Sequence, residues 1–198
     1  SFNRSFKLDE ESVNLWMRIL ARVPGSVLWQ KADETHMKRV FLDAAARHGI
    51  APERIIFAGN TSSVSLHLAR AGLADLGLDT LIYNGHTITS DMLWAGVPVI
   101  TREGTHFASR VSASLLRAVG LDDCVAESIE AMEDLAVSLA TNPARRAALR
   151  ERLRLNKTFM PLYDTERYTR HFETALTMML DRARQGLAPP APTLPTRS

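Results

Sequence analysis

Three absences limit what this 198-residue chain can be. It has one cysteine, Cys124, which excludes an internal disulfide, and the stretch 121–126 around it reads as a short buried strand. No apolar run approaches the roughly 20 residues that a membrane span needs, and no signal peptide opens the sequence. We therefore expect a cytoplasmic protein that does not enter a membrane.

The sequence also lacks a strong excess of one charge sign and any pattern of metal ligands. The net charge is +2, and the lysines and arginines are scattered, whereas a protein that binds nucleic acid needs a basic stripe. Six histidines without a His-x-x-x-His pair, together with one cysteine, predict no metal site. Neither a Gly-x-Gly-x-x-Gly fingerprint nor a Gly-Lys-Ser/Thr phosphate loop occurs, which argues against a nicotinamide cofactor or ATP.

What the sequence does contain is a regular alternation of strands and helices, with 45% hydrophobic residues to build a core. Strand patterns occur before Asn3 and at 26–29, 54–58, 74–79, 98–101 and around Cys124. Helical patterns separate them at 9–23, 35–48, 63–71, 89–95 and 108–119, and three more helices follow at 128–140, 143–156 and 164–184. This alternation predicts an α/β domain with a doubly wound, Rossmann-like parallel sheet over residues 1–185. Four prolines predict a disordered tail at 186–198.

In such a sheet, ligands bind in the loops that follow the carboxyl ends of the strands. These loops are 3–7, 30–33, 59–63, 80–89 and 102–108. The most informative runs from Tyr83 to Asp91, because Gly85 permits a tight turn and the next residues enter a helix. Free N–H groups and the helix dipole would bind a diphosphate there, with His86 and Thr87 as further donors and Asp91 for ribose hydroxyls. An ordinary glycine turn with a threonine cap is the plain alternative.

Two further groups accompany this loop. Arg4 and Lys7 lie in the first strand-to-helix loop, where Lys7 would stabilise an anionic leaving group, although an isolated lysine is more often solvated. His67 and Arg70 are three residues apart on one helical face, which suits a nucleobase or ribose. A solvent-facing pair would have the same spacing.

Seven segments in order resemble the O-linked N-acetylglucosamine transferase and SPINDLY family. They are SFNRSFK (1–7), VPGSVLW (23–29), RIIF (54–57), LADLGLDT (73–80), NGHT (84–87), DMLWAGVP (91–98) and ASRV (108–111). The resemblance runs from Ser1 to about Arg184.

The resemblance implies a GT-B enzyme of two Rossmann-like halves, of which this chain is the C-terminal, donor-binding half. Such an enzyme moves N-acetylglucosamine from UDP-N-acetylglucosamine to Ser or Thr of a protein acceptor, by an inverting and metal-independent reaction without a cofactor. The acceptor site would lie on an N-terminal half preceded by TPR repeats, and the helix 164–184 would cross onto that half. Lys7 would be catalytic. The donor-binding residues would be Arg4, Lys7, Ser62, His67, Arg70, Gly85, His86, Thr87, Ile88 and Asp91.

The donor sugar is the most open part of this hypothesis. Arg4 replaces an amide, Val64 replaces a lysine, and Ile88 replaces a second threonine of the N-acetylglucosamine enzymes. His86 and Asp91 nevertheless match that branch, because plant SPINDLY has threonine and glutamate there. UDP-N-acetylglucosamine therefore leads, with GDP-fucose as the alternative donor. A non-catalytic nucleotide-sugar-binding module, or a GT-B-like epimerase or phosphorylase, is a competing function.

Overall fold

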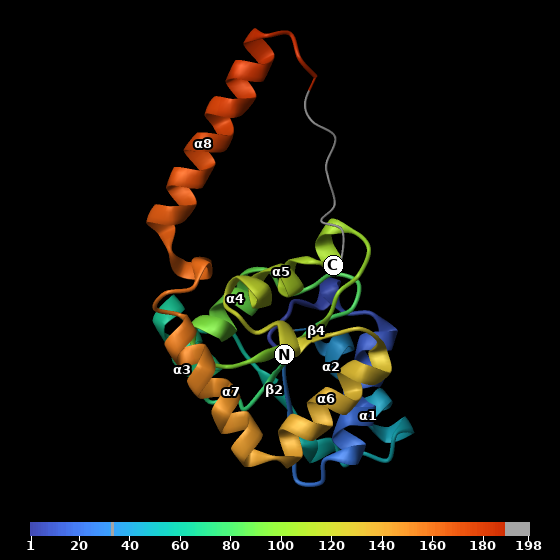
Figure 1. Ribbon diagram of the computed structural model, residues 1–198. Coiled ribbons are helices and arrows are strands. Elements are labelled where there is room, and N and C mark those ends of the chain that lie inside the picture. The colour runs from blue at the N-terminus through green and yellow to red at the C-terminus, as the bar shows by residue number, and fades with distance from the viewer. Residues whose placement is uncertain (33, 189–198) are drawn as a thin grey trace. The chain divides into compact units, whose positions relative to one another are not determined.

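The computed structural model describes residues 1–32 and 34–188. The chain forms two compact units, Ser1–Met160 and Pro161–Ser198, which are considered separately (Figure 1). The sequence predicts one Rossmann-like domain over residues 1–185 that includes the last helix, and this stays a prediction. The predicted tail lies outside the described residues from position 189 onward.

The first unit is an alternation of short strands and helices. Its strands are β1 (Leu28–Lys31), β2 (Ile55–Ala58), β3 (Gly77–Leu78), β4 (Val99–Arg102) and β5 (Val125–Ala126). Its α-helices are α1 (Glu10–Arg22), α2 (Thr35–Arg47), α3 (Val64–Ala71), α4 (Thr87–Trp94), α5 (Val111–Ala118), α6 (Ile129–Thr141) and α7 (Pro143–Asn156). Single 3₁₀ turns are η1 (Ser5–Lys7), η2 (Pro52–Arg54), η3 (Phe107–Ser109) and η4 (Asp122–Cys124).

All strand pairs are parallel, as predicted. β1 pairs with β2, and β3, β4 and β5 form a second group in that order. Residues 1–3 extend the β1 side, since the Ser1 nitrogen donates to Trp29 O at 2.8 Å and Lys31 N donates to Ser1 O at 3.1 Å. The same residues and β3 line one narrow gap. Counting residues 1–3 as the first strand, the order is that of a Rossmann sheet, and its reversal falls between residues 1–3 and β3.

Helices cover the strands in two groups (Figure 1). α1 packs against α2 and α6, and α3, α4 and α5 form a second series, while β4 contacts both α6 and the pair α4–α5. The core of the first group includes Trp16 and Phe41, whose buried rings stack at 6.3 Å and an interplanar angle of 6°. α1 begins at a local cap, because the Asp9 carboxylate accepts from Ser12 N at 2.8 Å.

Three local predictions needed correction. Residues before Asn3 make ladder hydrogen bonds but are not assigned as a strand. Cys124 is buried as predicted, but it ends the turn η4, and β5 starts one residue later. α4 starts at Thr87 rather than at Thr89, so Thr87 and Ile88 belong to its first turn.

The second unit contains the turn η5 (Pro161–Tyr163) and the long helix α8 (Thr165–Arg184). Asp164 caps α8 by accepting from Arg167 N at 2.8 Å. An exposed apolar stripe runs along the helix through Tyr168, Phe172, Leu176 and Met179. Its spacing is that of one helical face, as the sequence predicted.

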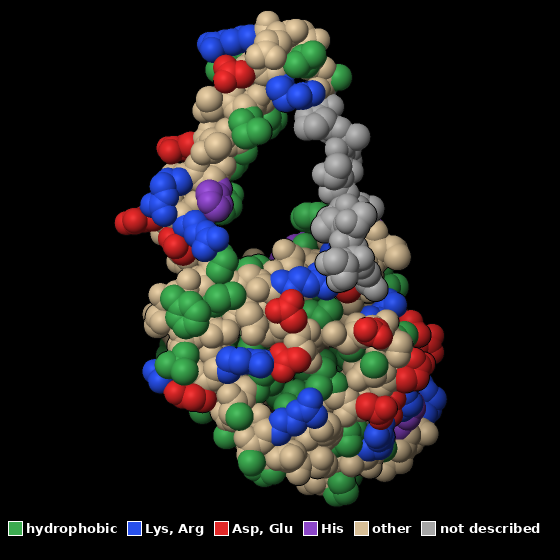
Figure 2. Space-filling view, viewed as in Figure 1, with side chains coloured by type: hydrophobic (Ala, Val, Ile, Leu, Met, Phe, Trp, Pro, Cys, Tyr) green, Lys and Arg blue, Asp and Glu red, His purple; other side chains and the backbone are tan. Residues whose placement is uncertain are grey.

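The surface carries charges of both signs. On the face shown in Figure 2, Lys and Arg side chains lie among Asp and Glu side chains. None of the helices within residues 1–32 and 34–188 is both long enough and apolar enough to span a membrane.

Arg54, which directly precedes β2, binds the end of α1. Its guanidinium donates to Leu20 O, Val23 O and Ser26 O at 2.8, 2.9 and 2.7 Å, and so satisfies carbonyls around the end of α1. We predict that Arg54→Ala lowers the free energy of unfolding by about 2 kcal/mol, since it removes these hydrogen bonds from a charged donor. Urea unfolding measures the change. Exposed Arg39→Ala is the matched control, and an equal effect of both variants would contradict the role of Arg54.

Candidate functional site

A cavity of about 520 Å³ opens at the carboxyl ends of the strands. Its walls come from the loops that follow residues 1–3, β1, β2 and β3, together with α3 and the start of α4. This is the point at which the strand order reverses. A Rossmann-type sheet binds its ligand there because the loops diverge and leave a crevice.

The cavity gathers most of the residues that the sequence singled out. Its predicted members are Arg4, Lys7, His67, Arg70, His86, Thr87, Ile88 and Asp91. Ser62 and Gly85 are not in the wall: Ser62 is exposed on its loop, and Gly85 is buried beneath the cavity. Three segments far apart in sequence, 4–7, 67–70 and 86–91, therefore meet at one place.

The loop between β3 and α4 is held by a buried carboxylate. Asp79 follows β3 and is 1% exposed. One of its oxygens accepts from Gly85 N at 2.7 Å, and the other accepts from the Thr101 hydroxyl at 2.7 Å. Burial raises the pKa of Asp79, and these hydrogen bonds oppose the shift.

Gly85 is required by close packing rather than by an unusual backbone angle. A Cβ atom at this position would lie 2.6 Å from Thr89 Oγ1 and 3.1 Å from Asn3 Oδ1. Its N–H group is committed to Asp79, and its carbonyl accepts from the Ser112 hydroxyl at 2.9 Å. Gly85 therefore shapes the loop, and the donors available to a ligand come from the residues after it.

Those donors stand at the start of α4. His86 occupies the N-cap position and makes no capping hydrogen bond through its side chain. Thr87 and Ile88 form the first turn and line the cavity. An uncapped helix start presents free N–H groups and the positive end of the helix dipole, which together suit an anion.

The Lys7 ammonium lies beside this helix start. Its Nζ donates to Asn84 O at 2.7 Å and lies 4.2 Å from the centre of the Tyr83 ring. Partial burial lowers the pKa of Lys7, and the negative charge of Asp79 acts in the opposite direction. Lys7 makes no ion pair with any residue of the described chain.

A second polar group lies on α3 and α4. His67 Nε2 is 3.4 Å from an Asp91 carboxylate oxygen, and the Arg70 guanidinium is 3.3 Å from His67 Nδ1. Since arginine can only donate, Nδ1 must accept, which places the proton of a neutral ring on Nε2 facing Asp91. Arg70 also donates to Gly59 O at 2.6 Å and lies 4.7 Å from the Phe2 ring centre.

Sequence reasoning missed several residues of the wall. They are Phe2, Asn3, Phe6, Lys31, Asn60, Thr61 and Tyr83. All except Phe2 lie in the loops that strand ends had identified, so position after a strand was the available signal. Asn3 is the most unusual of them, because its buried Oδ1 has no hydrogen-bond partner within the described chain.

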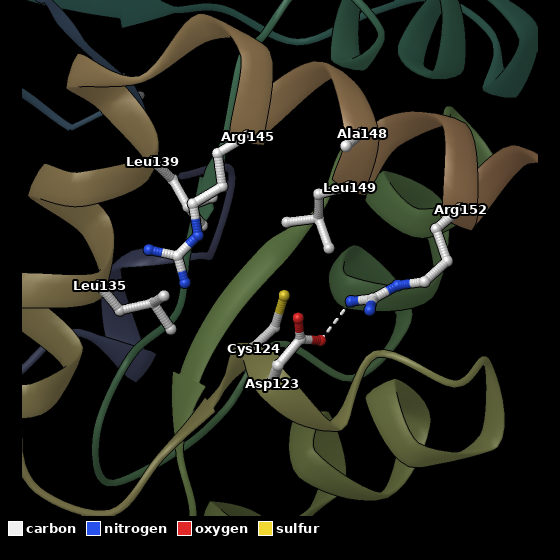
Figure 3. Close-up of a pocket in the computed structure, with 8 residues that line it drawn as sticks. All are labelled: Asp123, Cys124, Leu135, Leu139, Arg145, Ala148, Leu149 and Arg152. Carbon is white, nitrogen blue, oxygen red and sulfur yellow. Dashed lines mark hydrogen bonds and ion pairs between the residues drawn. The ribbon is translucent and has the colours of Figure 1, made fainter.

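A second cavity, of about 270 Å³, lies between α6, α7 and η4 (Figure 3). Leucines of α6 and α7 line it, and an ion pair joins Asp123 to Arg152 at its edge. Burial raises the pKa of the Cys124 thiol to about 12, which makes it a poor nucleophile. Because η4 precedes β5, this cavity is at the amino ends of the strands, away from the candidate site.

Among residues 1–32 and 34–188, no three His, Cys, Asp or Glu side chains are grouped closely enough to hold a metal ion.

The fold and the site together define the class. The parallel sheet with its cavity at the strand reversal matches GT-B glycosyltransferases. A mutant of Thermobaculum terrenum O-GlcNAc transferase superposes with a TM-score of 0.87 at 33% identity, over 94% of this chain and 36% of that one. The glycosyltransferase WaaG, of lipopolysaccharide biosynthesis, shares the fold with a TM-score of 0.60 at 21% identity, over 77% of this chain and 40% of that one.

The family follows from the sequence comparison. The profile of glycosyl transferase family 41 matches residues 1–172, and the chain belongs to that family. The Arabidopsis thaliana protein named probable UDP-N-acetylglucosamine–peptide N-acetylglucosaminyltransferase SEC is 41% identical over 90% of this chain and 18% of its own length. The Caenorhabditis elegans UDP-N-acetylglucosamine–peptide N-acetylglucosaminyltransferase is 33% identical over 94% of this chain and 16% of its own. The chain thus spans less than a fifth of these relatives.

The pH dependence of folding tests the buried carboxylate. A raised pKa in the folded state means that Asp79 contributes stability below its ordinary pKa of 3.8 and that this contribution is lost as the pH rises through the raised value. We predict that, from about pH 3 to about pH 7, the unfolding free energy of Asp79→Asn rises relative to that of the wild type. Urea unfolding at several pH values measures the difference. A difference independent of pH would contradict this assignment.

Proposed function

We propose that this chain is the donor-binding half of an inverting protein O-glycosyltransferase that uses UDP-N-acetylglucosamine. The observation that carries the proposal is that Lys7, the start of α4 and the His67–Asp91 pair line one cavity at the strand reversal. The curated relatives are named for the same donor and for a peptide acceptor. Membership of family 41 supports a glycosyltransferase activity.

The diphosphate of the donor binds at the start of α4. The N–H groups of Thr87 and Ile88 and the helix dipole favour its negative charge. Lys7 adds a full positive charge from the opposite loop, and its hydrogen bond to Asn84 O fixes it beside the same turn. Arg4, exposed at the cavity wall, adds a second cation.

The nucleoside binds on the other side of that turn. Asp91 lies one helical turn after the phosphate donors, which places a carboxylate acceptor within reach of ribose hydroxyls. His67 and Arg70 present a ring and a guanidinium to the base. The Phe2 ring contacts both of these side chains. Ser62 contributes from its exposed loop beside Thr61.

Lys7 stabilises the leaving group during transfer. The acceptor hydroxyl attacks the anomeric carbon and gives its proton to a base on the half that binds the acceptor, while the bond to the diphosphate breaks and its electron pair leaves with the nucleotide. The charge that develops on the departing oxygen is stabilised by the Lys7 ammonium and by the N–H groups of α4. These donors are in place before the reaction, so the stabilisation needs no metal ion or cofactor.

The acceptor site belongs to an N-terminal half outside this chain, with TPR repeats before it. The exposed stripe of α8, Tyr168–Phe172–Leu176–Met179, supports this arrangement, because an amphipathic helix of this length normally packs on another surface. In a GT-B enzyme that surface is the other half. We place the reaction in the cytoplasm, as the lone thiol suggested.

GDP-fucose is the alternative donor. SPINDLY-named relatives also match, for example one from Solanum lycopersicum at 32% identity over 96% of this chain and 21% of its own length. These relatives are also named for UDP-N-acetylglucosamine. His86 and Asp91 at the cavity favour the uridine nucleotide, because they match the N-acetylglucosamine branch.

Removal of the Lys7 ammonium tests the catalytic role. We predict that Lys7→Ala in the full-length enzyme lowers transfer of a radiolabelled sugar by roughly 100- to 1000-fold, the usual effect of losing one charge-stabilising donor. Lys38→Ala on α2, away from the cavity, is the matched control and should retain activity. Near-normal turnover of Lys7→Ala would refute the role.

Nucleotide binding separates the competing functions. We predict that the full-length protein binds UDP more tightly than GDP by calorimetry and transfers sugar to protein. Tighter binding of GDP would favour the fucose donor. Nucleotide binding without transfer or hydrolysis would indicate a non-catalytic module, interconversion of free nucleotide-sugars an epimerase, and dependence on inorganic phosphate a phosphorylase.

A further inference from the structure

Helix α7 carries long cationic side chains that reach the ends of neighbouring helices. Arg150 donates to Ala74 O at 2.8 Å and to Gly72 O at 3.4 Å, directly after α3 (Figure 1). Lys157, the C-cap residue of α7, donates from Nζ to the carbonyl of Trp94, the last residue of α4, at 2.6 Å. We call Arg150 and Lys157 the α7 cations.

The α7 cations satisfy carbonyls that a helix leaves unpaired at its C-terminal end. In α4, the carbonyls of residues 91–93 accept from backbone N–H groups of the turn that follows, and the next carbonyl, that of Trp94, accepts from Lys157. In α3, the C-cap residue is Gly72, whose carbonyl accepts from Arg150. A cation at this end also interacts favourably with the helix dipole. The α7 cations therefore stabilise α3 and α4 where each helix ends.

The same two helices carry half of the predicted donor-binding residues. They are His67 and Arg70 on α3, and Thr87, Ile88 and Asp91 on α4. α4 has eight residues, which at 1.5 Å per residue makes it about 12 Å long. So short a helix acts as a rigid rod, and the position of its last carbonyl therefore affects where its first N–H groups lie.

The C-terminal ends of α3 and α4 lie close together. A Cβ atom at Gly72 would be 3.5 Å from the carbonyl oxygen of Ala95, the residue after α4. Arg150 and Lys157 are two helical turns apart on α7, so one face of this helix reaches both ends. At the cavity, the contact between His67 and Asp91 joins the same two helices. The spacing of α3 and α4 is thus fixed at both of their ends.

We propose that Arg150 and Lys157 are positioning residues for nucleotide binding, which they support by holding α3 and α4 in their mutual arrangement. This inference rests on the proposed function and adds to it two residues that lie outside the cavity wall. The groups that bind the base, the ribose and the diphosphate come from two helices, so binding depends on how these helices lie relative to each other. Displacements of about 1 Å are enough to impair a site.

α7 also offers a matched control. Arg146 donates to Leu139 O and Ala140 O at 2.9 and 3.1 Å, near the end of α6, and its Nε lies 3.2 Å from an Asp75 carboxylate oxygen. All of α6 lies within the described residues, and none of it lines the cavity. Arg146 thus makes the same kind of contact as Arg150, but at a helix without a role in the proposed site. A general loss of stability would affect both variants alike.

The test compares Arg150→Met, Lys157→Met and Arg146→Met in the full-length protein, by urea unfolding and by calorimetry with UDP. If the wild type prefers GDP, GDP is the probe. We expect all three variants to unfold at lower urea concentration, because each removes hydrogen bonds from a charged donor. Arg150→Met and Lys157→Met should also weaken nucleotide binding by roughly fivefold, whereas Arg146→Met should stay within about twofold of the wild type.

Rescue by a conservative variant completes the test. Lys157→Arg keeps a cation that reaches the end of α4, and it should bind the nucleotide nearly as well as the wild type. Unchanged affinity in Arg150→Met or in Lys157→Met, or an equal loss in Arg146→Met, would overturn the inference while leaving the proposed function intact. Lys157 is only half-buried, so Lys157→Met remains decisive if Arg150→Met does not fold. A wild-type protein that binds neither nucleotide would overturn the proposed function, and this inference with it.

Discussion

The buried carboxylate of Asp79 is the constraint on which the site depends. Asp79 follows β3 and joins that strand to β4 through Thr101. It also joins β3 to the loop before α4 through Gly85 N–H. The loop can then turn sharply enough for α4 to begin at Thr87. Burying a carboxylate costs free energy, and hydrogen bonds to both of its oxygens partly offset that cost. The same bonds fix the geometry of the loop.

Most of the fold was predictable because its signals are local. Helical periodicity and caps are read within a few residues, and each helix of the first unit appeared near its predicted position. The failures occurred where tertiary contacts decide. Residues 1–3 are held by bonds to Trp29 and Lys31, and Cys124 falls in a turn because only Val125 and Ala126 pair with β4. No local pattern contains such pairings.

The candidate site was predictable to the extent that loops after parallel strands meet at one edge. That rule identified the loops that bring Lys7 and His86 together, whereas His67 lies on α3, the helix that follows another of these loops. It could not rank residues within a loop. Gly85 is a packing residue whose N–H is already used, and Ser62 is exposed and not part of the wall. The ring contacts that connect Phe6, Tyr83, His86 and Phe107 could not be predicted, because positions 6, 83 and 107 become neighbours only after the sheet has formed.

The environment of Lys7 suits an anionic ligand better than the environment of Arg110 or Arg117 does. Both arginines are paired with Glu103, with nitrogen–oxygen distances of 3.3 and 2.7 Å. Lys7 is held instead by a carbonyl and an aromatic ring, neither of which cancels its charge. The nearest carboxylate in its electrostatic surroundings, Asp79, is turned toward Gly85 and Thr101. Partial burial then strengthens the attraction between this ammonium and a diphosphate, because less water screens it. Within the described residues, the Lys7 charge is thus positioned without an ion pair next to the start of α4, and such an arrangement favours an anion.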